Sequence, residues 1–171
     1  GLVGCQGDDT PVGPTDSSVA DAEASRGSGP VRSTVLTARA VELDLGGVVV
    51  STWGYEQFAA ATPMRVDLGD RLEVRLRNDL PEPTSVHWHG LALRNDMDGV
   101  PGVTQPMVMP GEEFGYRFTV STPGTHWFHP HHGTQLDRAL YAPLLVDDPD
   151  EPGRYDVEQV VVLDDWTDGL G

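Results

Sequence analysis

The stretch Arg71-Leu72-Glu73-Val74-Arg75-Leu76-Arg77 alternates charged and apolar residues at every position. Successive side chains of a β-strand point to opposite faces of the sheet, so this run predicts a strand with one buried and one solvated face. Gly69-Asp70 precedes it and Asn78-Asp79-Leu80-Pro81 follows it, and both are turn sequences. The run therefore indicates a β-sheet that packs against a core on one side.

Short apolar or alternating segments recur on both sides of this strand. They are residues 34–45, 48–50, 64–67, 114–120, 140–146 and 157–163. Gly46-Gly47 predicts a hairpin turn between the first two segments. The chain has 20 glycines and 14 prolines in 171 residues, as expected for many turns, and no long helical periodicity competes with the strands. We expect an all-β sandwich that forms a single domain over residues 31–166.

The charge of the chain argues against two classes of partner. It carries 11 basic and 27 acidic residues, a formal net charge of -16. Such a surface repels nucleic-acid phosphates and anionic lipid headgroups. The longest aliphatic run, Val160-Val161-Val162-Leu163, is far shorter than a membrane-spanning helix requires.

The N-terminal region has the composition of an exported tether. Leu2-Val3-Gly4-Cys5 resembles the lipobox of bacterial lipoproteins, in which the cysteine is lipidated. Residues 6–30 are rich in Gly, Ser, Thr, Pro, Asp and Ala, and cannot bury enough apolar surface to fold. We expect residues 1–30 to be a signal remnant and a disordered acidic linker. The expected location is the cell envelope, with a lipid anchor at Cys5, or secretion. Alternatively, Cys5 is an incidental thiol in the linker.

All six histidines of the protein lie in two short clusters. The first is His87-Trp88-His89, and the second, residues 126–133, holds His126, His129, His131 and His132. In a strand, residues i and i+2 share a face and lie roughly 6.6 to 6.8 Å apart. The parity predicts a shared face for His87 with His89 and for His129 with His131, and places His126 and His132 on the opposite face from the second pair.

Paired imidazoles on neighbouring strands are a natural metal site. Neutral imidazole suits copper, zinc, iron and nickel. The wide spacing within one strand favours several ions over one, although a single tetrahedral ion remains an alternative if the side chains converge. A third interpretation is that the histidines are structural and satisfied by hydrogen bonds.

The order of several motifs resembles the first cupredoxin domain of multicopper oxidases, of the laccase-like and copper-exporting type. These motifs are His87-Trp88-His89-Gly90-Leu91, the run from Asp98-Gly99-Val100-Pro101 to Gln105, Pro110-Gly111-Glu112, and Trp127-Phe128-His129-Pro130-His131. The resemblance extends from about Val31 to Trp166. It implies a cupredoxin-like Greek-key β-sandwich, and it implies that residues 167–171 begin the connection to a second cupredoxin domain.

The resemblance also implies a set of copper ligands. His87 corresponds to a ligand of the type 2 copper, His89 and His129 to ligands of one type 3 copper, and His131 to a ligand of the other. These are half of the imidazoles of the family's trinuclear copper cluster, and the other half belongs to a later domain. The type 1 copper, with its Cys and His ligands, also belongs to that later domain. By this resemblance Cys5 is not a type 1 ligand.

Asp98 is the candidate catalytic acid. The family has an acid at this position, near the copper-bound oxygen, and a carboxylate there has a chemical rationale because reduction of dioxygen consumes protons. The alternative is that Asp98 only caps a turn before Gly99.

The resulting functional hypothesis is a copper-dependent oxidoreductase. The intact protein would take electrons singly from a small reducing substrate or metal ion and pass them to dioxygen, together with its remaining cupredoxin domains, while this chain alone would be inactive. A noncatalytic copper-binding or storage module is the first alternative. A single-zinc hydrolase is the second, and it lacks support because no His-Glu-x-x-His motif is present.

Overall fold

The computed structural model describes residues 29–58 and 62–166. Within them the strands are β1 (Val31–Asp44), β2 (Val49–Tyr55), β3 (Met64–Asp67), β4 (Arg71–Asn78), β5 (His87–His89), β6 (Glu113–Thr119), β7 (Gly124–His129) and β8 (Ala142–Asp147). Two short 3-10 helices, η1 (Asn95–Met97) and η2 (Leu136–Arg138), are the helical elements of these residues. Neither of them is long and apolar enough to cross a membrane.

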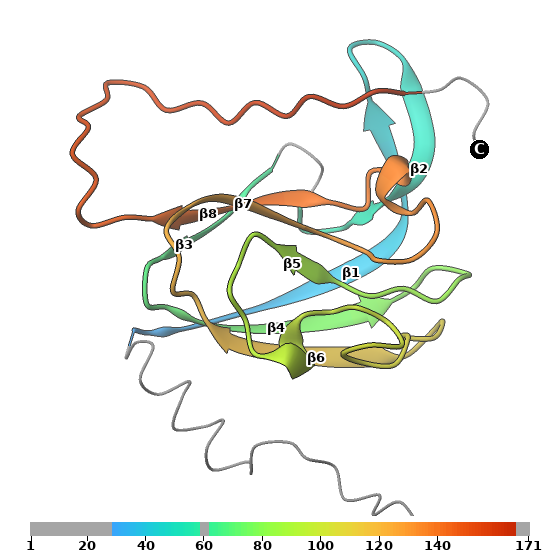
Figure 1. Ribbon diagram of the computed structural model, residues 1–171. Coiled ribbons are helices and arrows are strands. Elements are labelled where there is room, and N and C mark those ends of the chain that lie inside the picture. The colour runs from blue at the N-terminus through green and yellow to red at the C-terminus, as the bar shows by residue number, and fades with distance from the viewer. Residues whose placement is uncertain (1–28, 59–61, 167–171) are drawn as a thin grey trace, which may run out of the picture.

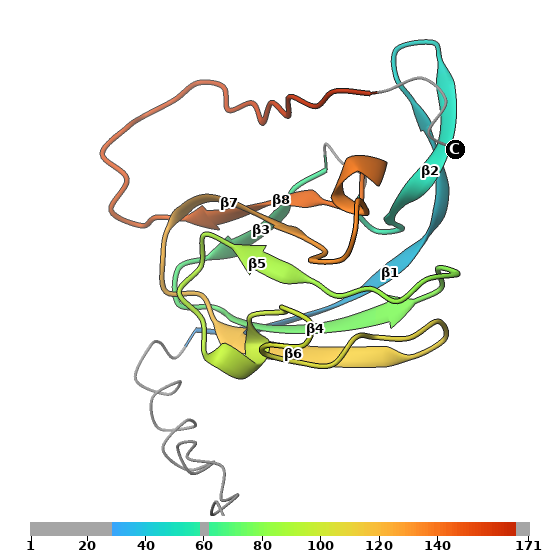
Figure 2. The ribbon, with the colours of Figure 1, turned by 45° about the vertical axis from the view of Figure 1, so that its right-hand side comes forward.

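The strands form two four-stranded sheets that pack face to face (Figures 1 and 2). One has the order β2-β1-β4-β6 and the other the order β3-β8-β7-β5. The β1–β4 and β3–β8 pairs are parallel and the remaining pairs are antiparallel. The chain passes from one sheet to the other after each of β2, β3, β4, β5 and β6. The all-β sandwich predicted from the sequence is confirmed.

β4 follows its sequence pattern residue by residue. Leu72, Val74 and Leu76 are buried, whereas Arg71, Arg75 and Arg77 are exposed. The antiparallel register sets Leu72 opposite Phe118 and Val74 opposite Tyr116 on β6, and both aromatic rings are buried as well. The apolar half of each strand thus forms one wall of the core.

The second sheet supplies the other wall, and its central side chain is Trp88. The Trp88 ring lies 4.9 Å from that of Phe118 and 5.3 Å from that of Phe128 between ring centroids, and Trp88 is fully buried. Burial of an aromatic ring of this size is a major stabilising contribution. Because Trp88 is flanked by His87 and His89, its burial directs both histidines to the outer face of the sheet.

The segment expected as the last strand is different in the structure. Residues 157–163 have no ladder partner among the described residues, and the predicted strand there is wrong. The segment follows β8, which is paired on both sides by β3 and β7, so no free backbone edge adjoins it. It runs instead across the outer side of β7 and β8 (Figures 1 and 2). Arg65 binds both Asp147 and Glu158, at 2.6 Å each, and anchors its start.

Several sequence predictions concern other parts of the chain. Cys5, almost all of the expected linker 1–30 and the expected connection 167–171 lie outside the described residues. The domain that was expected to begin at Val31 has its first strand there, and Gly46-Gly47 joins β1 to β2 as a hairpin with positive φ angles of 82° and 102°.

Candidate metal centre

Pairing of β5 with β7 brings the two histidine clusters together. The register sets His87 opposite His129, and His89 opposite Trp127. His87, His89 and His129 each offer one ring nitrogen, and these three nitrogens lie within 4.8 Å of one another. The centroid of the His131 ring lies 4.5 Å from that of His87 and 5.3 Å from that of His129. The four histidines predicted as ligands therefore converge, and three of them form the tightest group.

Local sequence explains why His129 lies at the end of β7 and His131 lies just beyond it. Pro130 lacks a backbone N–H and directly follows the last strand residue, His129. The next residue, His131, donates its backbone N–H to the Ser85 hydroxyl at 3.2 Å. Ser85 is buried just before β5. One hydrogen bond thus fixes His131 beside the first histidine cluster after the strand has ended.

The hydrogen bonds of the rings define which nitrogens are free. His87 donates Nδ1–H to the carbonyl oxygen of Asp98 at 2.7 Å, and His129 donates Nδ1–H to the carbonyl oxygen of Pro130 at 2.9 Å. Each neutral ring then has an unprotonated Nε2. Metal-binding histidines in proteins are oriented by this kind of contact from the second nitrogen.

The distance between one ring nitrogen of His89 and one of His129 fits two ligands of the same metal ion. His89 Nδ1 lies 3.3 Å from His129 Nε2. Two imidazole nitrogens at about 2.0 to 2.1 Å from one tetrahedral ion are about 3.3 to 3.4 Å apart, from the tetrahedral angle. The donor set is neutral and entirely nitrogen, as copper and zinc favour. The residues present therefore fit a metal ion at this position.

The surroundings of two of these rings, His129 and His131, favour their neutral form. Burial, and then the nearby His87, His131 and His89, lower the pKa of His129 to about 4. Burial and the neighbouring histidines also lower the pKa of His131. A neutral ring offers a lone pair at physiological pH, so His129 and His131 are ready to bind a cation without first losing protons.

Asp98 lies next to the cluster, but its main chain makes the closer contact. Its carboxylate Oδ1 is 3.5 Å from His87 Nδ1, whereas its carbonyl oxygen accepts the 2.7 Å hydrogen bond. Asp98 also ends η1 by donating its backbone N–H to the Asn95 carbonyl. The turn-capping role is thus observed, and the role as an acid stays a prediction.

Gly99 is what allows the Asp98 loop to approach β5. Its φ angle is +80°, and a Cβ built on it would lie 1.7 Å from the Val86 carbonyl oxygen. Such an overlap excludes every side chain at this position without a shift of the backbone. The loop can therefore deliver the Asp98 carbonyl to His87 only with glycine at position 99.

The remaining two histidines have other partners. His126 donates Nε2–H to the Thr122 carbonyl oxygen at 3.0 Å, and the His132 carbonyl oxygen accepts from Gln135 N–H at 3.2 Å. Neither belongs to the three-histidine group. Sequence reasoning missed Trp127, whose ring stacks on His129 at 4.2 Å between centroids and lies 5.1 Å from His89. Strand parity was the available signal, because residues 127 and 129 share a face.

Comparison with known proteins identifies the family. The sequence matches the multicopper oxidase family over residues 37–151. The chain belongs to the multicopper oxidases. It is 51% identical over 151 residues to the multicopper oxidase MmcO of Mycobacterium tuberculosis, covering 88% of this chain and 30% of that protein. It is 38% identical to copper resistance protein A of Pseudomonas syringae, covering 82% of this chain and 24% of that protein.

Solved multicopper oxidases share the fold. A multi-copper oxidase from Pseudomonas thermotolerans superposes with a TM-score of 0.65 and 42% identity, over 70% of this chain and 30% of that one. A laccase from Botrytis aclada gives a TM-score of 0.66 and 32% identity, over 71% of this chain and 23% of that one. The cupredoxin-like sandwich is confirmed by these matches. This chain spans less than a third of the length of each of these relatives.

Proposed function

We propose that this multicopper oxidase domain contributes four histidines to a trinuclear copper cluster, and that the whole protein transfers electrons from a one-electron donor to dioxygen. His87 would bind the type 2 copper, His89 and His129 one type 3 copper, and His131 the other. The 3.3 Å separation of His89 Nδ1 and His129 Nε2 carries this proposal, since it is the spacing of two ligands on one ion.

Copper, when bound, supplies the one-electron redox chemistry that links a phenol or a reduced metal ion to dioxygen. The chain's own residues prepare the site. The Asp98 and Pro130 carbonyls hold His87 and His129 with Nε2 unprotonated, and Ser85 positions His131. The Asp98 carboxylate is one-third exposed and lies 3.5 Å from His87 Nδ1, and in this proposal it holds a proton for dioxygen reduction.

The remaining parts of the proposal concern the whole protein. Further cupredoxin domains would supply the other cluster ligands and the type 1 copper. The protein would act outside the cytoplasm, either secreted or attached to a membrane by lipid at Cys5. Mass spectrometry of Cys5 after expression in a bacterium that processes lipoproteins tests the anchor.

Copper titration of this chain tests the metal site. We expect Cu(II) to bind with nitrogen hyperfine coupling in the EPR spectrum, and His89→Ala or His129→Ala to weaken binding about 100-fold, because each removes one of the converging nitrogens. His126→Ala is the matched control, since His126 lies in the same cluster and bonds Thr122 instead. Equal affinities for His129→Ala and His126→Ala would contradict the assignment.

Oxygen uptake separates the oxidase from a copper-binding module. The exposed positions of His89 and His131 would also suit a protein that only binds copper. We expect this chain alone to bind copper without consuming dioxygen in the presence of a phenol, an iron(II) salt or copper(I). A longer form with the remaining cluster ligands should consume it. A longer form that binds stoichiometric copper and consumes none would favour the binding module.

A further inference from the structure

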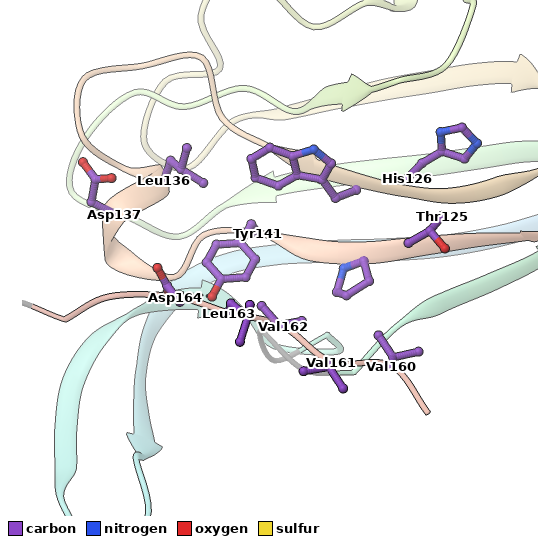
Figure 3. A pocket seen from close by; sticks show the side chains of 12 residues that line it. Thr125, His126, Leu136, Asp137, Tyr141, Val160, Val161, Val162, Leu163 and Asp164 are labelled. Atoms are coloured by element: carbon purple, nitrogen blue, oxygen red, sulfur yellow. Dashed lines mark hydrogen bonds between the residues drawn. The ribbon is translucent and has the colours of Figure 1, made fainter. Parts of the chain in front are cut away.

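A cavity lies beside the histidine cluster on the outer side of β7 and β8. It has a volume of about 450 Å³, is partly open, and lies between these strands and the segment 160–164 (Figure 3). Its lining is largely apolar and includes Trp127, Tyr141 and Pro143. Tyr141 and Asp164 lie side by side at this cavity (Figure 3).

Trp127 is shared by the cavity and the candidate metal centre. Its ring stacks on His129 with 4.2 Å between centroids and lies 5.1 Å from His89. On the cavity side, it meets the edge of Tyr141 with 6.3 Å between centroids and 75° between the ring planes. All three separations are those of packed aromatic rings. A row of rings therefore leads from two candidate copper ligands to Tyr141.

The row of rings ends at Tyr141, whose hydrogen-bond acceptor, the Asp164 carboxylate, can take up a proton. Tyr141 donates its hydroxyl hydrogen to Asp164 Oδ2 at 2.6 Å, and Asp164 is exposed. Burial and the nearby carboxylate raise the pKa of Tyr141 well above its ordinary value, so the phenol is neutral at physiological pH. A neutral phenol that loses an electron becomes a strong acid, and it requires an acceptor within hydrogen-bond reach.

We propose that Trp127, Tyr141 and Asp164 form a one-electron relay between the metal centre and the protein surface. A one-electron oxidant at the metal centre takes an electron from Trp127, and Tyr141 returns one electron to the oxidised indole. The Tyr141 O–H bond breaks as its proton moves to Asp164, which leaves a neutral tyrosyl radical and a protonated carboxyl group. A donor at the surface, such as a phenol or a reduced metal ion, then supplies one electron, and the proton returns to Tyr141.

The other described tyrosines lack this combination. Tyr55 is buried and its hydroxyl has no hydrogen-bond partner, and the Tyr116 hydroxyl accepts from the Val86 N–H. Tyr155 bonds the Glu151 carboxylate at 3.3 Å, but it is exposed and has no ring neighbour within the described part of the chain. Tyr141 alone among them joins a tryptophan to a carboxylate. Packing accounts for its ring contact but does not require its hydroxyl to bond an exposed acid.

The relay would protect the copper ligands. An oxidising equivalent left at the metal centre without a donor would otherwise oxidise the neighbouring side chains, of which Trp127 and His129 are the nearest in the row. Moving it to Tyr141, which is buried but lines the cavity, brings it beside the exposed Asp164, where a small reductant can quench it. The relay rests on the proposed function in one respect: that function supplies the natural oxidant at the metal centre.

A photochemical experiment tests the relay without copper or dioxygen. In a Cys5→Ser background, His89→Cys carries a thiol-reactive ruthenium polypyridyl photo-oxidant, which places the oxidant against the Trp127 ring. After a flash with a sacrificial electron acceptor, we expect the EPR spectrum of a neutral tyrosyl radical. Tyr141→Phe should lower the tyrosyl yield about tenfold and leave a tryptophanyl radical. Tyr155→Phe is the matched control and should retain the parent yield.

A second variant keeps both rings in place. Asp164→Asn replaces an exposed residue with an amide that is too weak a base to accept the proton, and should slow tyrosyl formation about tenfold. Near-ultraviolet circular dichroism checks that each variant is folded. The relay is overturned if the tyrosyl yield is unchanged in Tyr141→Phe, if Trp127→Phe forms the radical as fast as the parent, or if Asp164→Asn has no effect. Failure of copper to bind would affect only the proposed function.

Discussion

Replacement of Gly99 by alanine should weaken copper binding, although Gly99 is not itself a candidate ligand. The backbone at Gly99 has φ +80°, a region that costs an L-residue about 1 to 2 kcal/mol. The added Cβ would overlap the Val86 carbonyl oxygen at 1.7 Å and the His87 backbone nitrogen at 2.9 Å. The loop must therefore move away from β5, which breaks the hydrogen bond from His87 to the Asp98 carbonyl, worth about 0.5 to 1.5 kcal/mol.

These contributions predict a loss of about 1.5 to 3.5 kcal/mol in the free energy of unfolding. The affinity for Cu(II) should fall about 10- to 100-fold as well, because His87 loses the contact that orients it. Urea unfolding of the copper-free chain measures the first quantity, and calorimetric titration with Cu(II) measures the second.

Gly102→Ala is the matched control in the same loop. Its φ angle is +74°, but a Cβ there has nothing within 4 Å. It should show only the backbone strain, about 1 to 2 kcal/mol, and retain the parent affinity for copper. Equal effects of the two substitutions on copper binding would refute the reasoning, since they would mean that the close approach of Gly99 to β5 does not position His87.

Three further predictions concern the core and the supports of the site. Trp88→Ala should lower the free energy of unfolding by about 3 to 5 kcal/mol in urea, because it empties the centre of the core. Ser85→Ala should weaken Cu(II) binding about tenfold in a calorimetric titration, because the His131 backbone loses its hydrogen-bond acceptor. Burial raises the folded-state pKa of Tyr116 to about 12, above an unfolded value of 10.0. Its contribution to stability is complete below pH 10 and should fall by about 2 to 3 kcal/mol as the pH rises to 12, a loss that Tyr116→Phe should remove when unfolding is measured across this range.

Features that depend only on neighbours along the chain could be predicted before the fold was known. Strand parity buried Leu72 and Trp88 and turned His87 and His89 to one face, because alternation is a property of each strand alone. The order of the histidine motifs was specific enough to indicate the family. The fold class followed from the same short segments and turns.

Features that depend on residues distant in the chain became visible only in the folded protein. The register of β5 and β7 set His87 opposite His129, and the approach of Gly99 to Val86 delivered the Asp98 carbonyl to His87. Within the described ranges β8 is paired on both sides, and residues 157–163 have no ladder partner there, although their pattern favoured a strand. That same placement brought Asp164 to Tyr141 and joined them to Trp127. Such contacts depend on how separate strands pair and pack, and no local pattern of residues encodes them.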